Sequence, residues 1–473
     1  MASPLPARPK LATHVLARRH LVDGEPRVVL HDLGSGGLVQ VGPREWELLA
    51  AADGTRDLEG IVLAAAREGA HARAPAVAAF LEQLHGAGML DEGIEAAPAP
   101  SGDEDPGAAA RPLEGLSGFT LSCDGSGSCC RLYASILFAP VEAARARALR
   151  PQVLGGGERH DRVFMPERGS GPTGGAVVAL CDGRCAYLAG SGRCQLHEAG
   201  GAAAKPVGCT TYPATFTDDG EVVRVSVSVE CACVLASVDR EGGAPIMPPG
   251  ALVRGDLDET LAVTSLPPLV QVSPAAMAPR ADLRSWSRRV AALLPAPEVA
   301  SALVSLGAAV VAGGLAADVA PALSRPAPIE PASLLPWIAA LHGRARRRER
   351  EDSAWRSERD LALRATRWIA AAAATLLEPG ALAALLAAPV VAPRAEAFYL
   401  RALIHGHHLA GALPLSLALH DRAVRIVVAR ALPLVFAGVP EGALDPACAH
   451  PLALLEALLR GHGLDAYAHD LAE

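Results

Sequence analysis

The sequence predicts an α+β protein with several domains, and three observations support this class. The chain has 473 residues, enough for two to four domains of ordinary size. Hydrophobic residues make up 51% of it and aromatic residues only 4%, so Ala, Leu and Val must fill the core. Nine of the ten cysteines fall between Cys123 and Cys233, and long Ala- and Leu-rich stretches follow them.

The first domain is expected over residues 12–93 and combines two strands with three helices. Apolar runs at Arg27–Leu33 and Gly37–Val41 predict strands joined by a Gly-Ser-Gly-Gly turn. Apolar residues then recur at helical spacing. The predicted helices are Pro43–Ala52, Arg56–Gly69 and Ala74–Ala87.

The remaining boundaries follow from composition. Residues 94–115 are rich in Ala, Pro, Gly, Asp and Glu, which is typical of a flexible linker. A cysteine-rich α+β domain is expected over residues 116–238, before the Pro-rich stretch Glu241–Gly250. Residues 251–473 predict an all-α domain. Its expected helices are Asp282–Leu294, Glu298–Ala317, Pro331–Arg350, Ser353–Leu376, Pro393–Leu409 and Leu415–Val435.

The cysteine-rich region carries the chemistry that the sequence suggests most strongly. Thiolates bind zinc and iron–sulfur clusters, and a dense cluster of cysteines in a long reduced chain indicates metal ligation rather than disulfides. A bound metal would stabilise this Gly-rich, aromatic-poor segment. The sequence leaves zinc and an iron–sulfur cluster as equal alternatives. The nine cysteines are Cys123, Cys129, Cys130, Cys181, Cys185, Cys194, Cys209, Cys231 and Cys233.

Two local patterns predict how some of these thiols meet. Cys129 and Cys130 are adjacent, so both can serve one site only if the chain turns there. Valines alternate with polar residues from Val222 to Val229, which predicts a strand with one buried face. Continued extended geometry would then put Cys231 and Cys233 on one face, the face of Val223 and Val225.

The N-terminal part resembles the PqqD-like peptide-binding fold, a small winged-helix type. The resemblance rests on "EWELLAAADGTRDLEGIVLAAA" followed by "VAAFLEQLHGAGML", within Val28–Leu90. It implies a winged-helix-like domain that binds a peptide as an added strand along the sheet edge, beside the third helix. A winged-helix domain without a peptide partner is the alternative.

The cysteine region resembles the YkgJ-type family of zinc- or iron-chelating proteins. The matching elements are a Cys before a Cys-Cys pair, "DGRCAYLAGSGRCQLH", "KPVGC" with a following "YP", and a final Cys after a strand. Thr210 stands where that family usually has Arg. The resemblance implies a main ligand set, with Cys181 and Cys233 as possible additional ligands. The main set is Cys123, Cys129, Cys130, Cys185, Cys194, Cys209 and Cys231.

A related group, the flagellin lysine-N-methylases, combines such a cluster with a helical C-terminal region. "PRAEAFYLRALIHGHHLAGAL", Pro393–Leu413, resembles part of that region. This resemblance implies methyl transfer from S-adenosylmethionine to a protein lysine, with a peptide or protein as substrate. The alternatives are a non-enzymatic zinc- or iron-chelating protein and a scaffold with a purely structural metal. No residue is assigned as catalytic.

Charge and hydropathy limit the other possibilities. A net charge of −8 argues against a nucleic-acid partner, and the Arg344–Arg350 run is interleaved with acidic residues. The N-terminus lacks the apolar core of a signal peptide. Val299–Ala317 has no charge but is expected to be a buried helix rather than a membrane span. We therefore expect a cytoplasmic protein, and the sequence does not predict its oligomeric state.

Four further side chains are expected to be structural. His405, His407 and His408 are close in sequence, but no acidic residue near them suggests a functional histidine site. Cys448 lies apart from the other cysteines, and we expect an inert buried thiol there.

Overall fold

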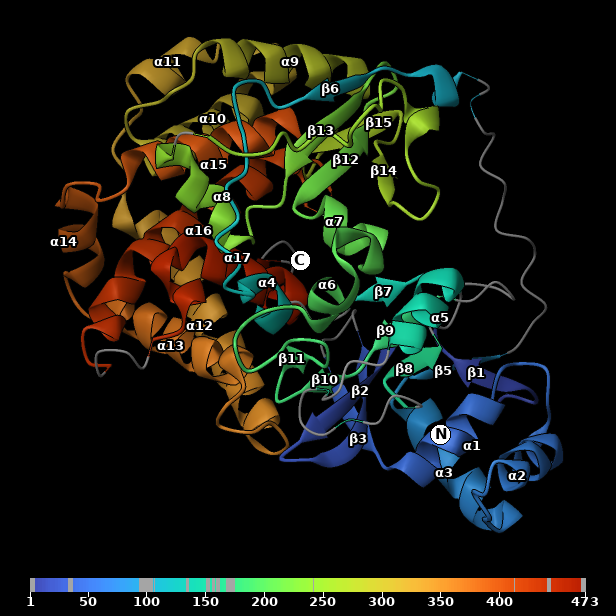
Figure 1. Cartoon of the computed structure of the whole chain (residues 1–473). Helices are drawn as coiled ribbons and strands as arrows, with labels where there is room; N and C mark the ends of the chain where they lie inside the picture. Colours follow the sequence, from blue (N-terminus) through green and yellow to red (C-terminus); the bar gives the residue numbers. More distant parts are fainter. Residues whose placement is uncertain are drawn as a thin grey trace. The chain divides into compact units, whose positions relative to one another are not determined.

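The computed structural model describes residues 5–32, 37–92, 105, 107–132, 136–149, 154, 158, 162–166, 175–240, 242–411, 413–439 and 444–468. It has a mixed α+β fold, which confirms the predicted class (Figure 1). The chain divides into two compact units: the first unit holds Met1–Asp105 and Ser135–Tyr187, and the second unit holds Pro106–Ala134 and Leu188–Glu473. Because compact units and predicted domains need not coincide, the domain limits given above stay predictions.

A five-stranded sheet organises the first unit. Its order is β11-β10-β2-β3-β4, and β10 runs parallel to β2 at His20 and Leu21. Both strands predicted from the sequence are confirmed as β3 and β4, although their connecting turn lies largely outside the described residues. The sequence analysis missed β2 because three consecutive basic residues interrupt its apolar pattern. The strands are β2 (Val15–Val22), β3 (Glu25–Asp32), β4 (Leu38–Val41), β10 (Leu180–Cys181) and β11 (Arg184–Cys185).

The three predicted helices of the first unit are confirmed. Pro43 occupies the first turn of α1, where its missing N–H is not needed, and Asp57 caps α2 by accepting from the Gly60 amide at 2.9 Å. Leu49 and Ile61 are fully buried in the shared core. The helices are α1 (Pro43–Ala51), α2 (Leu58–Arg67), α3 (Ala74–Gly86) and α5 (Pro140–Leu149). The smaller strands are β1 (Pro9–Leu11), β5 (Leu90–Glu92), β7 (Leu137–Phe138), β8 (Phe164–Pro166) and β9 (Ala176–Val178).

A four-stranded sheet in the order β14-β12-β13-β6 lies in the second unit. Its strands are β6 (Leu113–Gly115), β12 (Ala214–Asp218), β13 (Val223–Val227) and β14 (Val263–Ser265). The strand predicted around the valines is confirmed as β13. Strand β6 falls at the end of the predicted linker, which is therefore ordered there. Residues 94–104 and 106 of that linker lie outside the described residues.

The expectation that only one face of this strand is buried is wrong. All five residues of β13 are buried, including Arg224 and Ser226. The Ser226 hydroxyl donates to the carbonyl oxygen of Ala402 in α15 at 2.8 Å, and Arg224 pairs with Asp219. A helix therefore covers the polar face, and each polar side chain buried there has a partner.

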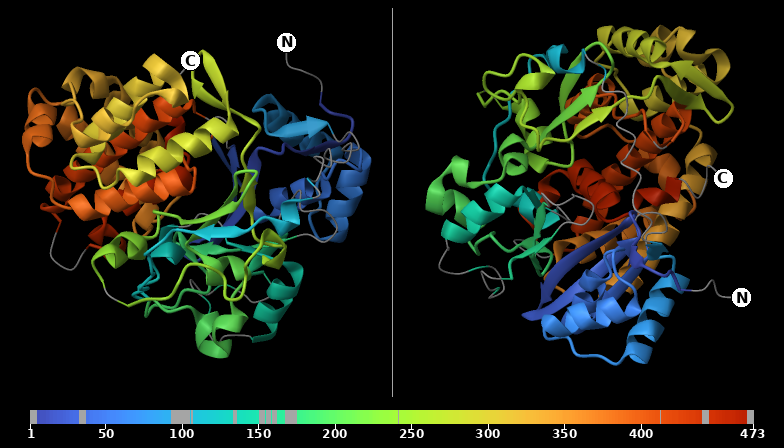
Figure 2. Two further views of the ribbon diagram at one scale, coloured as in Figure 1. Left: turned by 90° about the horizontal axis from the view of Figure 1, so that it is seen from above. Right: turned by 90° about the vertical axis from the view of Figure 1, so that its right-hand side faces the viewer.

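The second unit is otherwise mainly helical, and its later helices gather into one bundle in both views of Figure 2 (yellow to red). The six helices predicted after residue 251 are present, but the range is not all-α, since β14, β15 (Leu269–Ser273) and β16 (Ala276–Pro279) precede them. The long helices are α9 (Arg280–Ala292), α10 (Val299–Gly313), α12 (Pro331–Ser353), α13 (Leu361–Leu377), α15 (Pro393–His405), α16 (Leu415–Phe436) and α17 (Pro451–Gly461). The short helices are α4 (Ser128–Leu132), α6 (Gln195–Gly200), α7 (Val207–Thr211), α8 (Ala232–Ala236), α11 (Ala320–Ser324) and α14 (Ala381–Ala387).

Among the described residues, one stretch, Val299–Ala316, is long and apolar enough to cross a membrane, and the bent pair α13 and α14 would make a second candidate. This α10 segment buries Leu303 and Leu306 completely in the core of the second unit. A Cβ atom on Gly307 would lie 3.0 Å from the Ser416 carbonyl oxygen of α16. This close helix contact is the packing expected of a core helix.

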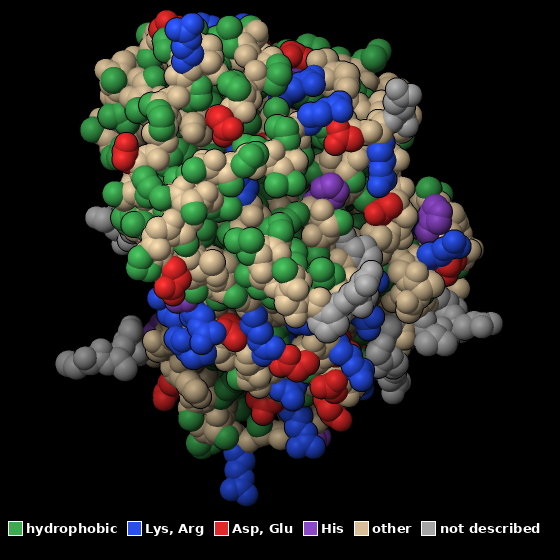
Figure 3. Space-filling model, turned by 90° about the vertical axis from the view of Figure 1, so that its left-hand side faces the viewer, with side chains coloured by type: hydrophobic (Ala, Val, Ile, Leu, Met, Phe, Trp, Pro, Cys, Tyr) green, Lys and Arg blue, Asp and Glu red, His purple; other side chains and the backbone are tan. Residues whose placement is uncertain are grey.

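Basic and acidic side chains lie near one another on part of the surface. Figure 3 shows one face on which hydrophobic side chains predominate in the upper part and basic and acidic side chains alternate below. In α12, Arg346 pairs with Glu349, and Glu349 also lies 3.4 Å from Arg367 of α13. Arg346, Arg347 and Arg350 of the run are exposed as predicted, but Arg348 is buried and pairs with Asp352 at 3.3 Å, so the prediction of a solvated helix face holds for only part of the run.

Candidate metal centre

Three potential metal-binding side chains meet in the second unit. Cys123 and Asp124 lie in the loop before α4, and Cys233 lies in the first turn of α8. One donor atom from each lies within 4.8 Å of the other two, and the Cys233 thiol donates to Asp124 Oδ1 at 3.3 Å. Cys123 and Asp124 are exposed, whereas Cys233 is buried. Two thiols and a carboxylate therefore converge where the surface meets the core.

Cys231 extends this group because its thiol also contacts Cys233. The predicted reason for this proximity is wrong, since the chain does not continue as a strand. Strand β13 ends at Val227, and Cys231 is the N-cap of α8. The start of a helix, rather than one face of a strand, brings the two side chains together. Helix α8 itself packs into the core of the second unit.

Cys129 and Cys130 lie in α4, so the chain turns at this pair as one shared site requires. Their Sγ atoms are 4.0 Å apart. Two contacts attach α4 to the helical part of the unit: Arg131 pairs with Asp445 at 2.6 Å, and His462 Nε2 lies 3.3 Å from the Leu132 carbonyl oxygen. The cysteine pair therefore has a fixed support.

The pKa shifts show which thiols affect one another. A hydrogen bond with Cys233, together with burial, raises the pKa of Cys123. The hydrogen bond with Cys123 lowers the pKa of Cys233, but the contact with Cys231 and burial outweigh it and raise that pKa to about 12. A hydrogen bond with Cys130 lowers the pKa of Cys129. Burial and the charge of Cys123 act in the opposite direction, whereas the charge of Lys205 lowers this pKa further. Five thiols thus form one electrostatic group.

A glycine contact holds the loop that carries Cys123 against a second cysteine segment. Gly127 has φ +71°, and a Cβ atom there would lie 2.6 Å from the Gly192 carbonyl oxygen and 2.8 Å from Leu188 Cδ1. Leu188 forms a β-bridge with Cys194 across this tight turn. Only glycine fits so close a backbone approach.

The other predicted ligands lie in different surroundings. Cys209 lies in α7, and Lys205, whose charge lowers the pKa of Cys129, directly precedes that helix. Cys181 and Cys185 belong to β10 and β11 of the first unit, where burial raises the pKa of Cys181 to about 12. Cys448 is buried near Asp445, and burial raises its pKa to about 11. The structure therefore brings together Cys123, Asp124 and Cys233, with Cys231 beside Cys233, while Cys129 and Cys130 form a separate pair whose Cys129 pKa is influenced by Cys123.

The sequence analysis missed Asp124 as a candidate ligand. Its Oδ1 atom also accepts from the Ser126 amide at 2.9 Å, which fixes the turn between Cys123 and α4. The signal was available, because a carboxylate directly after a clustered cysteine is an acceptable zinc ligand.

The arrangement is suited to binding a thiophilic ion. Zinc takes four ligands drawn from Cys sulfur, His nitrogen and carboxylate oxygen, and iron–sulfur clusters take Cys thiolates. Cys123, Asp124 and Cys233 supply three such donors within 4.8 Å of one another, and Cys231 lies beside Cys233. Comparisons of the chain with protein-family models, curated proteins and solved structures found no match.

Proposed function

We propose that this protein binds zinc or an iron–sulfur cluster through the thiolates of the second unit. The observation that carries the proposal is the meeting of Cys123, Asp124 and Cys233, whose donor atoms lie within 4.8 Å of one another. Cys129, Cys130 and Cys231 lie in the same electrostatic group, and Cys185, Cys194 and Cys209 remain predicted ligands.

The donor chemistry supports this proposal in two respects. Burying several thiols together without an ion raises their pKa values, and a bound cation would stabilise the thiolates instead. The exposed side chains of Cys123 and Asp124 leave the site accessible from solvent, so an ion could enter or exchange there. Accessible ligands suit a catalytic or metal-handling site better than a closed structural one.

The test is the metal content of full-length protein purified without oxygen, with its visible absorption spectrum. Iron with acid-labile sulfide and a brown colour would support a cluster, and stoichiometric zinc in a colourless protein would support a zinc site. Protein that contains neither metal and takes up neither on reconstitution would refute the proposal.

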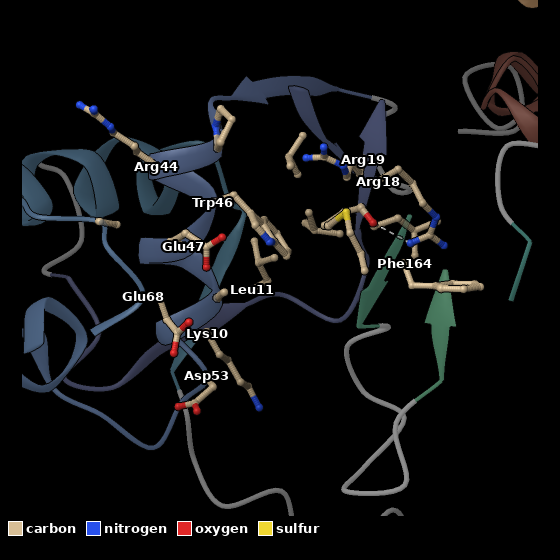
Figure 4. Close-up of a pocket in the computed structure, with 18 of the residues that line it drawn as sticks. Lys10, Leu11, Arg18, Arg19, Arg44, Trp46, Glu47, Asp53, Glu68 and Phe164 are labelled. Atoms are coloured by element: carbon tan, nitrogen blue, oxygen red, sulfur yellow. Dashed lines mark hydrogen bonds between the residues drawn. The ribbon is translucent and has the colours of Figure 1, made fainter. Parts of the chain in front are cut away.

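We further propose a peptide or protein partner for the first unit, treated as a winged-helix-like domain. A cavity of about 1590 Å³ supports this, with walls from β2, α1 and β8. In Figure 4, Trp46 extends from α1 toward the side where Arg18 and Arg19 of β2 lie. Strand β10 pairs with β2 only at His20 and Leu21. On the same edge of β2, the residues Val15 to Ala17 are not paired with β10, and they line the cavity. An extended peptide could add there as a strand.

The position of this cavity leads to a specific binding test. The family resemblance implies a peptide beside the third helix, α3, whereas this cavity is bordered by α1. Fluorescence anisotropy with labelled peptides encoded near this gene would measure binding. Trp46→Ala should weaken it if the cavity is used, whereas the exposed Gln83→Ala on α3 should leave it unchanged. Equal effects of both variants, or no binding by any peptide, would contradict this site.

Protein-lysine methylation is the enzymatic form of the proposal, and a cytoplasmic metal-binding scaffold is the alternative. Incubation with labelled S-adenosylmethionine and a bound peptide would separate them. Label on a peptide lysine would support the enzyme, and stable peptide binding without label would support the scaffold.

A further inference from the structure

A second cavity, of about 1000 Å³, lies within the second unit and shares two segments with the thiol group. One wall is the stretch Gly115–Thr120, which leads to Cys123. Another consists of Ser237, Val238 and Arg240, which follow α8, and the Ser237 hydroxyl accepts from the Ser122 amide at 2.8 Å. Helices α9 and α15 complete the lining. This volume is sufficient for an organic molecule of moderate size.

Positive charge predominates in the lining, although the whole chain has a net charge of −8. Glu114 is the acidic residue among the lining residues, against five arginines. Three of these arginines have carboxylate partners: Arg224 with Glu114 and Asp219, Arg288 with Glu221, and Arg394 with Asp239.

Two arginines of the lining form no such ion pair with a described residue, although the charge of Arg240 lowers the pKa of Asp124. Arg401 donates to the Ser117 carbonyl oxygen and, at 3.0 Å, to the Ser117 hydroxyl, both of which are uncharged. Within the described part of the chain, no carboxylate lies within 4.0 Å of the guanidinium of Arg240 or Arg401. Guanidinium groups bind carboxylates and phosphates strongly, because two parallel N–H donors match two oxygens.

A buried polar chain forms another part of the wall. His407 is 4% exposed, and its Nε2 atom lies 3.5 Å from Asp219 Oδ2. Its Nδ1 atom lies 3.4 Å from the Ser287 hydroxyl, which also lines the cavity. Asp219 is fully buried, and Arg224 Nε donates to it at 3.0 Å. His407 Nε2 has no hydrogen-bond partner among the described residues, so this wall holds a buried polar atom beside the paired Asp219 and Arg224.

Another part of the lining is apolar. The rings of Phe119 and Phe398 have centroids 4.7 Å apart. Leu294 and Pro295 add aliphatic surface beside them. A ligand that uses the whole cavity would therefore have a charged end and an apolar body.

We propose that this cavity binds a small organic anion. Its carboxylate or phosphate group is held by Arg401 and Arg240, and its apolar body lies against Phe119 and Phe398. The inference does not depend on which metal the thiol group holds.

Isothermal titration calorimetry on the full-length protein tests this with three probes that share a ring: benzoate, phenyl phosphate and neutral benzyl alcohol. We expect saturable binding of at least one anion, and weaker binding of benzyl alcohol. Arg401→Gln should reduce anion affinity at least about tenfold, the loss expected for a charge-assisted pair. The relative affinities of the two anions distinguish a carboxylate from a phosphate ligand.

The matched control is Arg350→Gln, which removes the same charge from an exposed position of α12 outside the cavity. It should leave the affinity unchanged. Arg401→Lys tests the same charge with a fold-preserving substitution and should retain part of the affinity. Equal losses in Arg401→Gln and Arg350→Gln, or no saturable binding of either anion at millimolar concentrations, would overturn the inference. Metal content measured on the same samples reports separately on the thiol group.

Discussion

Cys448 provides a matched control for the cysteines of the candidate metal centre. Cys233 and Cys448 are each 5% exposed, so replacing either by serine makes a similar change in a buried position. Cys233 lies within 4.8 Å of two other potential ligands, whereas Cys448 lies outside the thiol group. We expect Cys233→Ser to weaken metal binding at least about tenfold, since it removes a direct ligand.

Competition with a chromophoric chelator measures this difference, and Cys448→Ser should retain the metal affinity of the unchanged protein. An equal loss in both variants would mean that the effect is on folding, and an unchanged affinity in Cys233→Ser would remove it from the ligand set.

Glu456 links three helices, and its lowered pKa predicts how the free energy of unfolding depends on pH. Its carboxylate accepts from Tyr399 of α15 and lies 2.6 and 2.8 Å from Arg422 and Arg425 of α16. Burial raises the pKa of Glu456, but the two guanidinium groups outweigh it and lower that pKa to about 2. Because the folded-state pKa is depressed, the stabilisation is present above the unfolded pKa of about 4.3 and is lost as the pH falls toward 2.

This group should therefore contribute roughly 3 kcal/mol to the free energy of unfolding at neutral pH. Glu456→Gln should destabilise the protein by about 3–5 kcal/mol at pH 7 and flatten the loss of stability between pH 4 and 2. Urea unfolding at several pH values measures both effects. The exposed Glu358→Gln, which breaks only a surface pair with Arg367, should cost about 1 kcal/mol or less. A similar loss in the two variants would contradict this role for Glu456.

The cysteines could be predicted as donors from their clustering alone, but their partners could not. His407 illustrates the reason. We expected no acidic partner for it because none is near in sequence, yet Asp219 lies 3.5 Å away in the fold. Such pairs depend on where a helix end meets a sheet, which residue spacing does not encode.

At the level of elements, helices with a strong apolar period were predicted well, and short or polar elements were not. Strand β2 contains Arg18, Arg19 and His20, so its sequence does not resemble a strand, and pairing with β3 on one side and β10 on the other stabilises it. Helix α8 is only five residues long, and a strand was extended through it in the prediction. In both cases tertiary contacts override the local pattern.

The loop before α4 allows a test with two neighbouring glycines. Gly125 and Gly127 have nearly equal positive φ angles, +69° and +71°. A Cβ atom on Gly125 would meet nothing within 4 Å, whereas one on Gly127 would lie 2.6 Å from the Gly192 carbonyl oxygen. The backbone strain of an alanine is therefore similar at both positions, roughly 1 kcal/mol, and only Gly127→Ala adds a steric clash.

We expect Gly127→Ala to lower both the metal affinity and the melting temperature clearly more than Gly125→Ala, because it displaces the loop that carries Cys123 and Asp124. Parallel melting curves with and without added zinc measure this. Equal effects of the two substitutions would show that the contact with Gly192 does not position the loop.

For the whole molecule, the sequence indicated the α+β class but not how the chain divides. The first unit takes up Ser135–Tyr187, which places Cys181 and Cys185 in a different compact unit from Cys123 and Cys233. The chain passes from the second unit into the first at Ser135 and back into the second at Leu188. Neither crossing is marked by a change in amino-acid composition. Contiguous predicted domains could not represent this division.

Chelation of the metal should affect the second unit unevenly. The core of its helical part contains fully buried leucines from α10, α12, α16 and α17, so those helices have apolar packing of their own. The loop around Cys123 is short and contains Gly125 and Gly127, and the segment around Cys231 has only the five-residue helix α8 as regular structure. Removing the ion should leave like-charged thiolates or protonated, poorly paired thiols there, and either state favours local opening.

Hydrogen–deuterium exchange measured before and after chelation tests this prediction. We expect protection to fall over residues 118–132 and 228–240, while α10 and α16 keep theirs and the helical circular dichroism changes little. Added zinc should restore the lost protection. Global loss of protection would instead mean that the metal holds the entire second unit together. Unchanged exchange around Cys123 in protein shown to have lost its metal would place the ion elsewhere.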